Sequence, residues 1–258
     1  MSYTALAISL IFVLFPLFLS KTFNLGLEKD VVIAVVRSII QLLIVGYILQ
    51  FVFQSEQIVY VLLMIAVMIG AAVQNVWKKG AAIKGIIWKV TVTFILIEVL
   101  TQGILLGFQI TPATAQYIIP ISGMVIGNSM VLCLLFLNRF LSEVEARQEE
   151  VELILTLGGT PKQAIHHQLI TAIKASMIPT IESQKTIGLV QLPGMMSGQI
   201  IAGASPIQAV QFQLLILFLL LTTAAVSSIF LGFLSYPSLF NEKMQLMKIQ
   251  KRVGRNEK

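Results

Sequence analysis

Long apolar segments alternate with short polar connections along most of this 258-residue chain. A helix rises about 1.5 Å per residue, so roughly 20 apolar residues cross a hydrocarbon core of about 30 Å. The pattern predicts about seven membrane-spanning helices, at residues 3–20, 31–53, 58–76, 86–108, 113–137, 176–202 and 211–235. Segment 176–202 is the least regular, because Glu182, Lys185 and Pro193 interrupt its apolar run. We therefore expect an all-α integral membrane protein.

Composition agrees with this fold class. Hydrophobic residues make up 57% of the chain and charged residues only 12%, whereas a soluble domain carries about 25% charged residues. The first ten residues have no basic region and no small-residue cleavage pattern, so we expect them to belong to an uncleaved first membrane helix. The single cysteine, Cys133, excludes an internal disulfide.

Basic residues occur in alternate connections between the predicted spans, and this alternation predicts the topology. They are Lys21 and Lys29; Lys78, Lys79 and Lys84; Arg139, Arg147, Lys162 and Lys174; and, after residue 240, Lys243, Lys248, Lys251, Arg252, Arg255 and Lys258. The other connections, 54–57, 109–112 and 203–210, contain no Lys or Arg. Because cytoplasmic loops are rich in Lys and Arg, we expect a multi-pass protein of the cell (plasma or inner) membrane, with its N-terminus outside and its C-terminus in the cytoplasm. The dispersal of the charges among short loops argues against a nucleic-acid partner.

This topology divides the chain into a polytopic transmembrane domain, residues 1–240, and a basic cytoplasmic tail, residues 241–258. The longest internal connection, residues 138–175, is predicted to form a cytoplasmic helix-turn-helix. A capping box at Ser142 and Glu145 predicts the start of its first helix, and Gly158-Gly159 predicts the end. Three signals predict the start of the second helix: Thr160 as the cap, Pro161 at the first helical position and Gln163 at the third.

Four apolar residues share one face of the first of these helices, namely Val144, Val151, Ile154 and Leu155. The glutamates at 149, 150 and 152 point elsewhere. An apolar stripe on a cytoplasmic helix needs a surface that covers it. The stripe therefore either packs under the protein's own membrane domain or docks on a partner protein.

Four stretches of the sequence resemble one known family of membrane proteins. They are "RSIIQLLIVGYIL" (37–49), "PISGMVIGNSM" (120–130), "TLGGTPKQA" (156–164) and "IPTIESQKTIGLVQLPGMMSGQIIAGASPIQAVQFQ" (178–213). Together they resemble the FetB (YbbM) family of ABC transporter permeases over nearly the whole chain, a family described as iron exporters linked to oxidative-stress resistance. Glu152, with Gly158 six residues later, also resembles the cytoplasmic coupling loop of ABC-importer-type permeases, although Leu153 and Ile154 stand where that loop has two alanines.

The resemblance implies a permease subunit that exports iron, or a related metal, with a separate FetA-type ATPase and so contributes to metal homeostasis. No G-x-x-x-x-G-K-[ST] motif occurs in the chain, so we expect ATP and Mg²⁺ on the partner, and no cofactor and no catalytic residue here. Because ABC transporters use two membrane halves, we also expect a permease homodimer in the lipid bilayer. An importer-like loop in a family of exporters leaves the direction of transport open. The residues expected to couple to the ATPase are Val151, Glu152, Ile154, Leu155, Gly158, Gly159, Thr160 and Pro161.

Ionisable residues inside the predicted spans are costly in lipid and are therefore candidates for function. Arg37 and Glu182 each lie about 9 Å from the cytoplasmic end of a span, so they can pair at one level, with Lys185 on the same helix face as Glu182. The alternative is a structural charge network, or basic side chains that snorkel to the interface. Glu98 lies about 18 Å into its span, with Gln102 one turn further on. It is either protonated or exposed to a polar cavity.

Two further spans hold candidates for a translocation pathway. Gly123-x-x-x-Gly127 permits close helix contact, and Met124 and Asn128 share a face beside it. The stretch "LPGMMSG" (192–198) is predicted to interrupt the sixth span, because Pro193 lacks a backbone donor. The pathway residues we expect are Arg37, Gln41, Glu98, Gln102, Met124, Asn128, Glu182, Lys185, Pro193, Gly194, Met195 and Met196.

No spacing of residues in the sequence predicts a metal-binding site. Met195 and Met196 either offer sulfur to a soft ion such as Cu(I) or fill apolar space. His166 and His167, the only histidines, are adjacent and so lie on different helix faces. Iron as the cargo therefore depends on the resemblance, and the metal site stays unknown.

Two functions of other classes also fit the sequence. The first is an ion-coupled secondary transporter in which Glu98 relays protons. The second is a membrane scaffold or receptor that transports nothing and recruits a signalling protein through its loop. Transport by the lone chain along an ion gradient would indicate the first, and no flux under any energisation would indicate the second.

Overall fold

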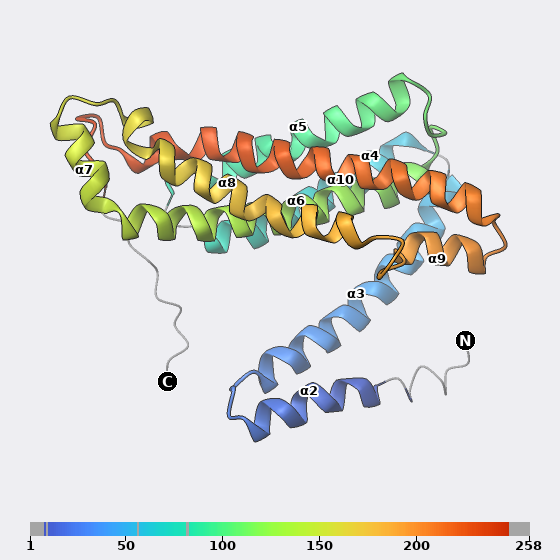
Figure 1. Ribbon diagram of the computed structural model, residues 1–258. Coiled ribbons are helices and arrows are strands. Elements are labelled where there is room, and N and C mark those ends of the chain that lie inside the picture. Colours follow the sequence, from blue (N-terminus) through green and yellow to red (C-terminus); the bar gives the residue numbers. More distant parts are fainter. Residues whose placement is uncertain (1–7, 9, 56, 81–82, 248–258) are drawn as a thin grey trace. The chain divides into compact units, whose positions relative to one another are not determined.

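The computed structural model describes residues 8, 10–55, 57–80 and 83–247, nearly all of them in helices (Figure 1). The chain divides into two compact units, Met1–Gln57 and Ile58–Lys258. The first unit contains α2 (Ile11–Thr22) and α3 (Glu28–Ser55). Residues 1–7 and 9 of the predicted first span, and residues 248–258 of the predicted tail, lie outside the described residues.

A short polar turn joins the two helices of the first unit. The hydroxyl of Ser20 donates to Glu28 Oε1 at 2.7 Å and accepts from the backbone N–H of Leu27 at 3.2 Å. The carboxylate of Glu28 lies at the N-terminus of α3, where negative charge interacts favourably with the helix dipole. Most apolar side chains of α3 are exposed, as expected of a helix whose surface is covered by lipid.

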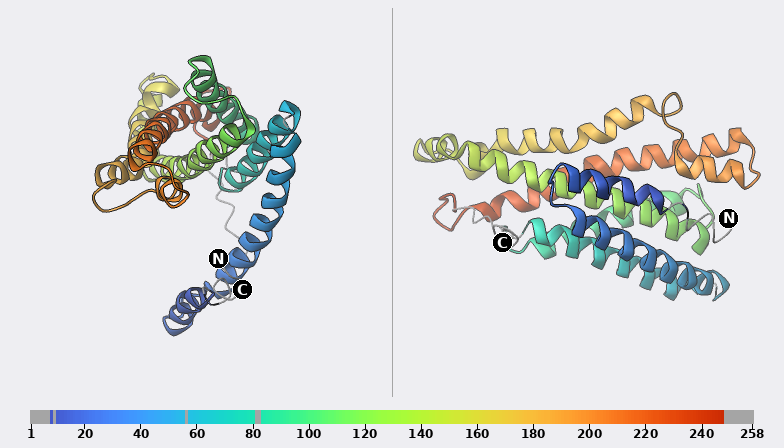
Figure 2. Two further views of the ribbon diagram at one scale, coloured as in Figure 1. Left: turned by 90° about the vertical axis from the view of Figure 1, so that its right-hand side faces the viewer. Right: turned by 90° about the horizontal axis from the view of Figure 1, so that it is seen from below.

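The second unit is a bundle built around α6. Its elements are α4 (Ile58–Lys79), α5 (Ile86–Gly107), α6 (Ala115–Ala146), α7 (Gln148–Thr156), α8 (Pro161–Thr186), α9 (Gly194–Ile201), α10 (Pro206–Ser235) and the 3-10 helix η1 (Tyr236–Leu239). Helix α6 packs against α4, α5, α8 and α10, and Figure 2 shows α6, α8 and α10 side by side along their lengths. The rings of Phe136 and Phe140 stack in the core with centroids 5.3 Å apart.

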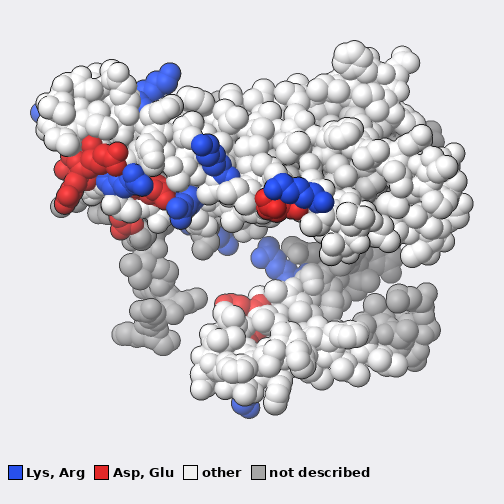
Figure 3. Space-filling view, in the orientation of Figure 1, with Lys and Arg blue, Asp and Glu red and all other residues white. Residues whose placement is uncertain are grey.

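Five of the described helices, α3, α4, α5, α6 and α10, are long and apolar enough to cross a membrane. Their bounds lie within five residues of the predicted spans, except that α6 continues nine residues further. Helix α2 is apolar but has only 12 residues, so the predicted count of seven spans is not confirmed. Figure 3 shows a largely uncharged surface over the second unit, with charged side chains gathered over α7 and the adjoining end of α6.

The predicted span at 176–202 is interrupted in the structure, as the sequence predicts, although the break begins before Pro193. Helix α8 begins at Pro161, in the predicted loop, and ends at Thr186; a non-helical segment then leads to α9. Gly188 adopts a φ of 85° in this segment, a left-handed conformation that glycine accepts without strain. The interruption predicted at Pro193 therefore comes earlier, and Pro193 is the residue that caps α9.

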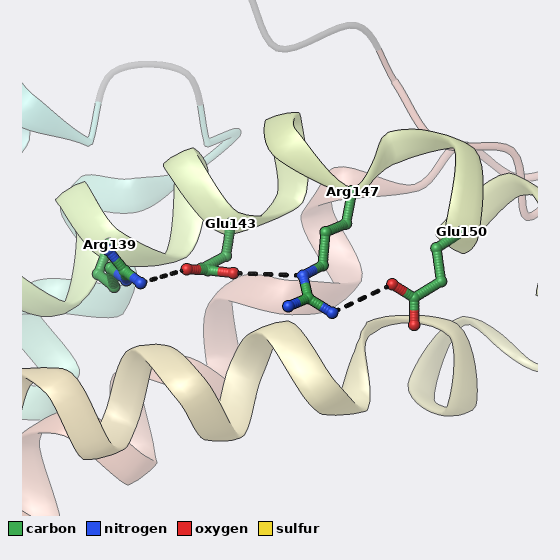
Figure 4. Close-up of polar contacts among 4 residues, drawn as sticks. All are labelled: Arg139, Glu143, Arg147 and Glu150. Carbon is green, nitrogen blue, oxygen red and sulfur yellow. Dashed lines mark hydrogen bonds and ion pairs between the residues drawn. The ribbon is translucent and has the colours of Figure 1, made fainter.

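The helix start predicted at Ser142 is also wrong, because Ser142 lies inside α6. Ion pairs one turn apart support the continued helix, with Glu143 Oε1 2.6 Å from Arg139 Nη2 and Glu143 Oε2 3.7 Å from Arg147 Nε. Figure 4 shows this row, which ends where Arg147 Nη1 lies 3.4 Å from Glu150 Oε2. Arg147 is the single residue between α6 and α7, so the chain turns there without a loop.

The turn between α7 and α8 has the capping chemistry that the sequence predicts. Gly158 has a φ of 87°, its N–H bonds to the carbonyl of Leu155, and the N–H of Gly159 bonds to the carbonyl of Ile154. This pair of bonds is a Schellman motif, which satisfies the last carbonyl groups of α7. Thr160 and Gln163 then form the reciprocal capping box that begins α8. Four hydrogen bonds thus fix the direction in which α8 leaves the turn.

Among the glycines of the described helices, Gly232 on α10, rather than the predicted Gly123-x-x-x-Gly127 pair, lies closest to the side chains of other helices. A Cβ atom added to Gly232 would lie 2.9 Å from Leu169 Cδ1 on α8 and 3.1 Å from Phe136 Cζ on α6. At Gly123 the nearest such atom, on Met68, is 3.7 Å away, and at Gly127 nothing lies within 4 Å. The absence of a side chain at Gly232 is therefore what lets these three helices meet.

We predict that Gly232→Ala lowers the midpoint of thermal unfolding of the purified protein. Overpacking a core costs roughly 1–3 kcal/mol, and replacement of a helical glycine by alanine gains about 1 kcal/mol, so the net loss is up to about 2 kcal/mol. Gly127→Ala is the matched control and should leave the midpoint unchanged or raise it. Equal midpoints for the two variants would contradict the close packing at Gly232.

Candidate functional site

A cleft of about 340 Å³ lies among α6, α8 and α10, next to the segment that leads to α9. Six of its lining side chains can form hydrogen bonds: Asn128, Thr180, Ser183, Gln184, Gln191 and Gln213. None of the lining side chains is charged; the remaining eight, which include Pro179 and Pro193, are apolar. The cleft can therefore bind a molecule or a hydrated ion through neutral amide and hydroxyl groups.

Two of these amides are held in place by the backbone of α10. Asn128 Nδ2 donates to the carbonyl of Leu220 at 3.3 Å, and Gln184 Nε2 donates to the carbonyl of Leu217 at 2.9 Å. Gln213 is 6% exposed, and its Oε1 has no hydrogen-bond partner within the described part of the chain. A buried acceptor without a donor is costly, so Gln213 is the lining residue most in need of a ligand or water.

A second buried polar group lies between α5 and α6, at Glu98. Ser122 on α6 donates its hydroxyl hydrogen to Glu98 Oε1, and Gln102 Nε2 donates to Ser122 Oγ at 2.8 Å. Glu98 is only 7% exposed. This bond could not be predicted from the sequence, because Glu98 and Ser122 lie on different helices. The group joins two of the candidate pathway residues, Glu98 and Gln102.

Some apolar side chains of α7, and of the turn that follows it, are exposed next to charged residues. Val151 is fully buried, and Val144 is buried too, so this part of the stripe packs in the protein's own fold. Leu153 and Leu157, one turn apart, are instead 59% and 79% exposed. Ile154 and Leu155 are half-buried. Of the residues expected to couple, Glu152, Gly158 and Thr160 lie on the surface.

A groove of about 540 Å³ lies beside the same turn. Its walls are Glu152, Leu155, Thr156, Gly158 and Gly159 on one side and residues 243–246 on the other. Asn241 organises the second wall, since its Oδ1 accepts from the backbone N–H groups of Lys243 and Gln245 at 2.9 Å each. The proximity of these C-terminal residues to the turn was not predicted, because no local sequence pattern indicates it.

The remaining candidate pathway residues do not form one site. Glu182 and Lys185 pair with each other at 2.6 Å on the exposed face of α8. Arg37 and Gln41 are exposed on α3, in the other unit, so the pairing of Arg37 with Glu182 stays a prediction. Gly194, Met195 and Met196 form the first turn of α9, and Met124 is half-buried on α6.

The described residues contain no group of three or more His, Cys, Asp or Glu side chains that could hold a metal ion. His166 and His167 are both exposed on α8. The cleft residues Thr180, Ser183, Gln184, Gln191 and Gln213 were missed by the sequence analysis, as was Ser122. Ser122 and Gln213 are polar residues in apolar stretches and so gave a signal, whereas Ser183 and Gln184 lie in a polar run; only the packing of separate helices brings the cleft residues together.

Comparison with known proteins gives one family and several relatives. The model of the uncharacterised protein family UPF0014 matches residues 3–240. The UPF0014 membrane protein YjkA of Bacillus subtilis is 56% identical over 246 residues, which cover 95% of this chain and 98% of YjkA. No solved structure matches the chain.

Two more distant relatives have names that refer to metals. The probable iron export permease protein FetB of Escherichia coli is 37% identical over 250 residues, 95% of each chain. Protein ALUMINUM SENSITIVE 3 of Arabidopsis thaliana is 33% identical over 240 residues, which cover 93% of this chain and 88% of that protein. The similarity thus extends across both units rather than a single segment.

We predict that Ser122→Ala destabilises the protein more than Ser129→Ala does. Both serines are fully buried on α6, but Ser122 bonds to Glu98 and Gln102, whereas Ser129 Oγ has no partner among the described residues. Loss of Ser122 leaves a buried acceptor and a buried donor unpaired, which costs roughly 1–3 kcal/mol. Thermal unfolding of the two purified variants measures the difference. A larger loss for Ser129→Ala would show that the Glu98 group does not tie α5 to α6.

Proposed function

The chain belongs to the uncharacterised protein family UPF0014, and from this premise we propose that it is the permease subunit of an ABC transporter that exports iron or a related metal. Its five apolar helices and its relatives' names identify a multi-pass membrane protein of a permease family. Iron and the export direction are supported by the name of the E. coli relative alone. We further propose that hydrolysis takes place on a separate FetA-type ATPase, which binds ATP and Mg²⁺.

The proposal depends most on the exposed apolar residues at the end of α7. We call Leu153, Leu157, Gly158 and Gly159 the coupling tip. Two exposed leucines in this tip are flanked by Glu149, Glu150 and Glu152. Glutamates so close together are costly in hydrocarbon, so the tip lies in water. Apolar side chains on a helix in water are typical of a face that enters a groove of another protein.

The coupling tip is rigid enough to transmit a force. Val151 anchors α7 in the protein's own core, and the Schellman motif and the capping box fix the turn. From the turn, α8 runs 26 residues, or about 39 Å at about 1.5 Å per residue. Its last two turns carry Pro179, Thr180, Ser183 and Gln184, which line the cleft. A displacement of the tip by the ATPase would therefore reach the cleft through one helix.

In this proposal the cleft is part of the translocation pathway, and two copies of the chain complete it. Asn128 and Pro193 are the predicted pathway residues that line the cleft. Neutral amides suit a metal that keeps part of its hydration shell or arrives bound to another ligand, since bare transition metals prefer charged or imidazole ligands. We place the N-terminus outside and the coupling tip in the cytoplasm of the plasma or inner membrane, as the basic loops indicate.

One observation favours a second function. Glu98 is a buried carboxyl group in the middle of a helix that is apolar enough to span a membrane. Buried carboxyl groups at this depth are typical of proton relays in pumps and transporters. An ion-coupled secondary transporter that works without an ATPase is therefore the alternative.

We predict that Leu157→Glu abolishes stable binding of the ATPase while the permease still inserts in the membrane. In the proposed complex the ATPase would cover Leu157. A charged side chain at this position should weaken the binding of the ATPase to the permease roughly tenfold or more. Leu189→Glu is the matched control, because Leu189 is 91% exposed just beyond the other end of α8. The measurement is the amount of co-expressed ATPase that purifies with each tagged permease. Equal recovery with Leu157→Glu and Leu189→Glu would remove the coupling tip from the interface.

A further inference from the structure

We propose that one turn of α5, formed by Glu98, Thr101 and Gln102, holds a small cation, either a proton or a monovalent metal ion. The proposal goes beyond the proposed function, because it concerns a buried site apart from both the cleft and the coupling tip. It does not depend on the cargo or on the ATPase.

Three oxygen atoms on this turn lack hydrogen-bond partners among the described residues. They are Glu98 Oε2, Thr101 Oγ1 and Gln102 Oε1, all buried. Residues three and four positions apart share a face of a helix, so the three side chains lie together on α5. Such a concentration of unpartnered oxygen is costly where water is excluded, and a positive charge would satisfy it.

The hydrogen bonds that the group forms leave two of its acceptors without donors. Ser122 has one hydroxyl hydrogen, which it donates to Glu98 Oε1, and Gln102 Nε2 donates to Ser122 Oγ. This arrangement leaves the second carboxylate oxygen and the amide oxygen without donors.

The amide of Gln102 can also be turned over, because its oxygen and nitrogen are assigned from the hydrogen-bond network. Ser122 would then donate to the amide oxygen, and Glu98 would have to donate to Ser122. A carboxylate has no hydrogen to give, so this arrangement needs a proton on Glu98. In both orientations of the Gln102 amide, therefore, the group needs one positive charge to neutralise Glu98.

No basic side chain of the described residues supplies that charge through an ion pair with Glu98; the ion pairs there involve Glu143, Glu150 and Glu182. On α5 itself, Lys89 lies nine residues earlier, about 14 Å along the helix, and donates to Ser238. Helices α4, α6 and α10 pack against α5. Their charged or titratable residues are Tyr60, Lys78 and Lys79 on α4 and Tyr117, Cys133, Arg139, Glu143 and Glu145 on α6, and α10 has none.

The two candidate cations share one chemistry, which is neutralisation of a carboxylate by a positive charge held between oxygen atoms. A proton needs no added space and converts Glu98 into a donor. A monovalent metal ion such as Na⁺ would be bound by the carboxylate, the hydroxyl and the amide oxygen, since hard cations prefer oxygen ligands. In either form the cation would keep α5 attached to α6 through Ser122.

The test uses the full-length permease in lipid nanodiscs and the variants Glu98→Gln and Glu182→Gln. Infrared spectroscopy records the carbonyl band of protonated carboxyl groups, and thermal unfolding is followed in NaCl, KCl and choline chloride at equal ionic strength. Glu182→Gln is the control, because Glu182 is an exposed carboxylate already paired with Lys185. Glutamine keeps the shape of glutamate, so both variants should fold.

We expect a protonated-carboxyl band in the wild type and in Glu182→Gln that is lost in Glu98→Gln. A metal ion would instead give no such band, and NaCl or KCl would raise the unfolding midpoint of the wild type but not that of Glu98→Gln. Either result supports the site and identifies its occupant. If Glu98→Gln removes no band and no salt distinguishes it from the wild type, the proposal is overturned.

Discussion

The structure depends on the enclosure of one face of α8, which carries polar side chains, by α6 and α10. Gln168 and Ser176 on α8 are completely buried, and Ser176 is hydrogen-bonded at 2.9 Å to Ser228 on α10. The bond between Ser176 and Ser228 pairs two hydroxyl groups that hydrocarbon would leave unsatisfied, so contact with α10 stabilises this face of α8. The missing side chain at Gly232 lets α10 approach closely enough for this contact. The same enclosure brings the polar residues of three helices together in the cleft.

Enclosure also explains how the two proposed sites are related. Helix α8 begins at the coupling tip and ends at the cleft, and α6 and α10 hold it between them. A capped helix with one face packed against two others moves as a unit, because packed interiors transmit displacement rather than absorb it. In the proposed function the tip, with its acidic surroundings, would bind the ATPase, and the cleft, with its uncharged lining, would bind the cargo.

The sequence predicted the features that depend on local chemistry. The bounds of α5 and the end of α10 follow from their apolar lengths, and the end of α7 and the start of α8 follow from Gly158, Thr160 and Gln163. The sequence analysis failed at Ser142, where a capping pattern gave way to ion pairs that continue α6. The cleft could not be predicted, because its polar residues are far apart in the chain and only tertiary packing brings them together.

The account's central claim is that this chain moves its cargo only when a separate ATPase acts on it. The most direct measurement is Fe²⁺ flux across vesicles that contain the purified permease, with and without the ATPase and ATP. The account predicts flux only when the ATPase and ATP are both present. Equal flux by the permease alone, driven by a proton gradient, would contradict it and favour ion-coupled transport through Glu98.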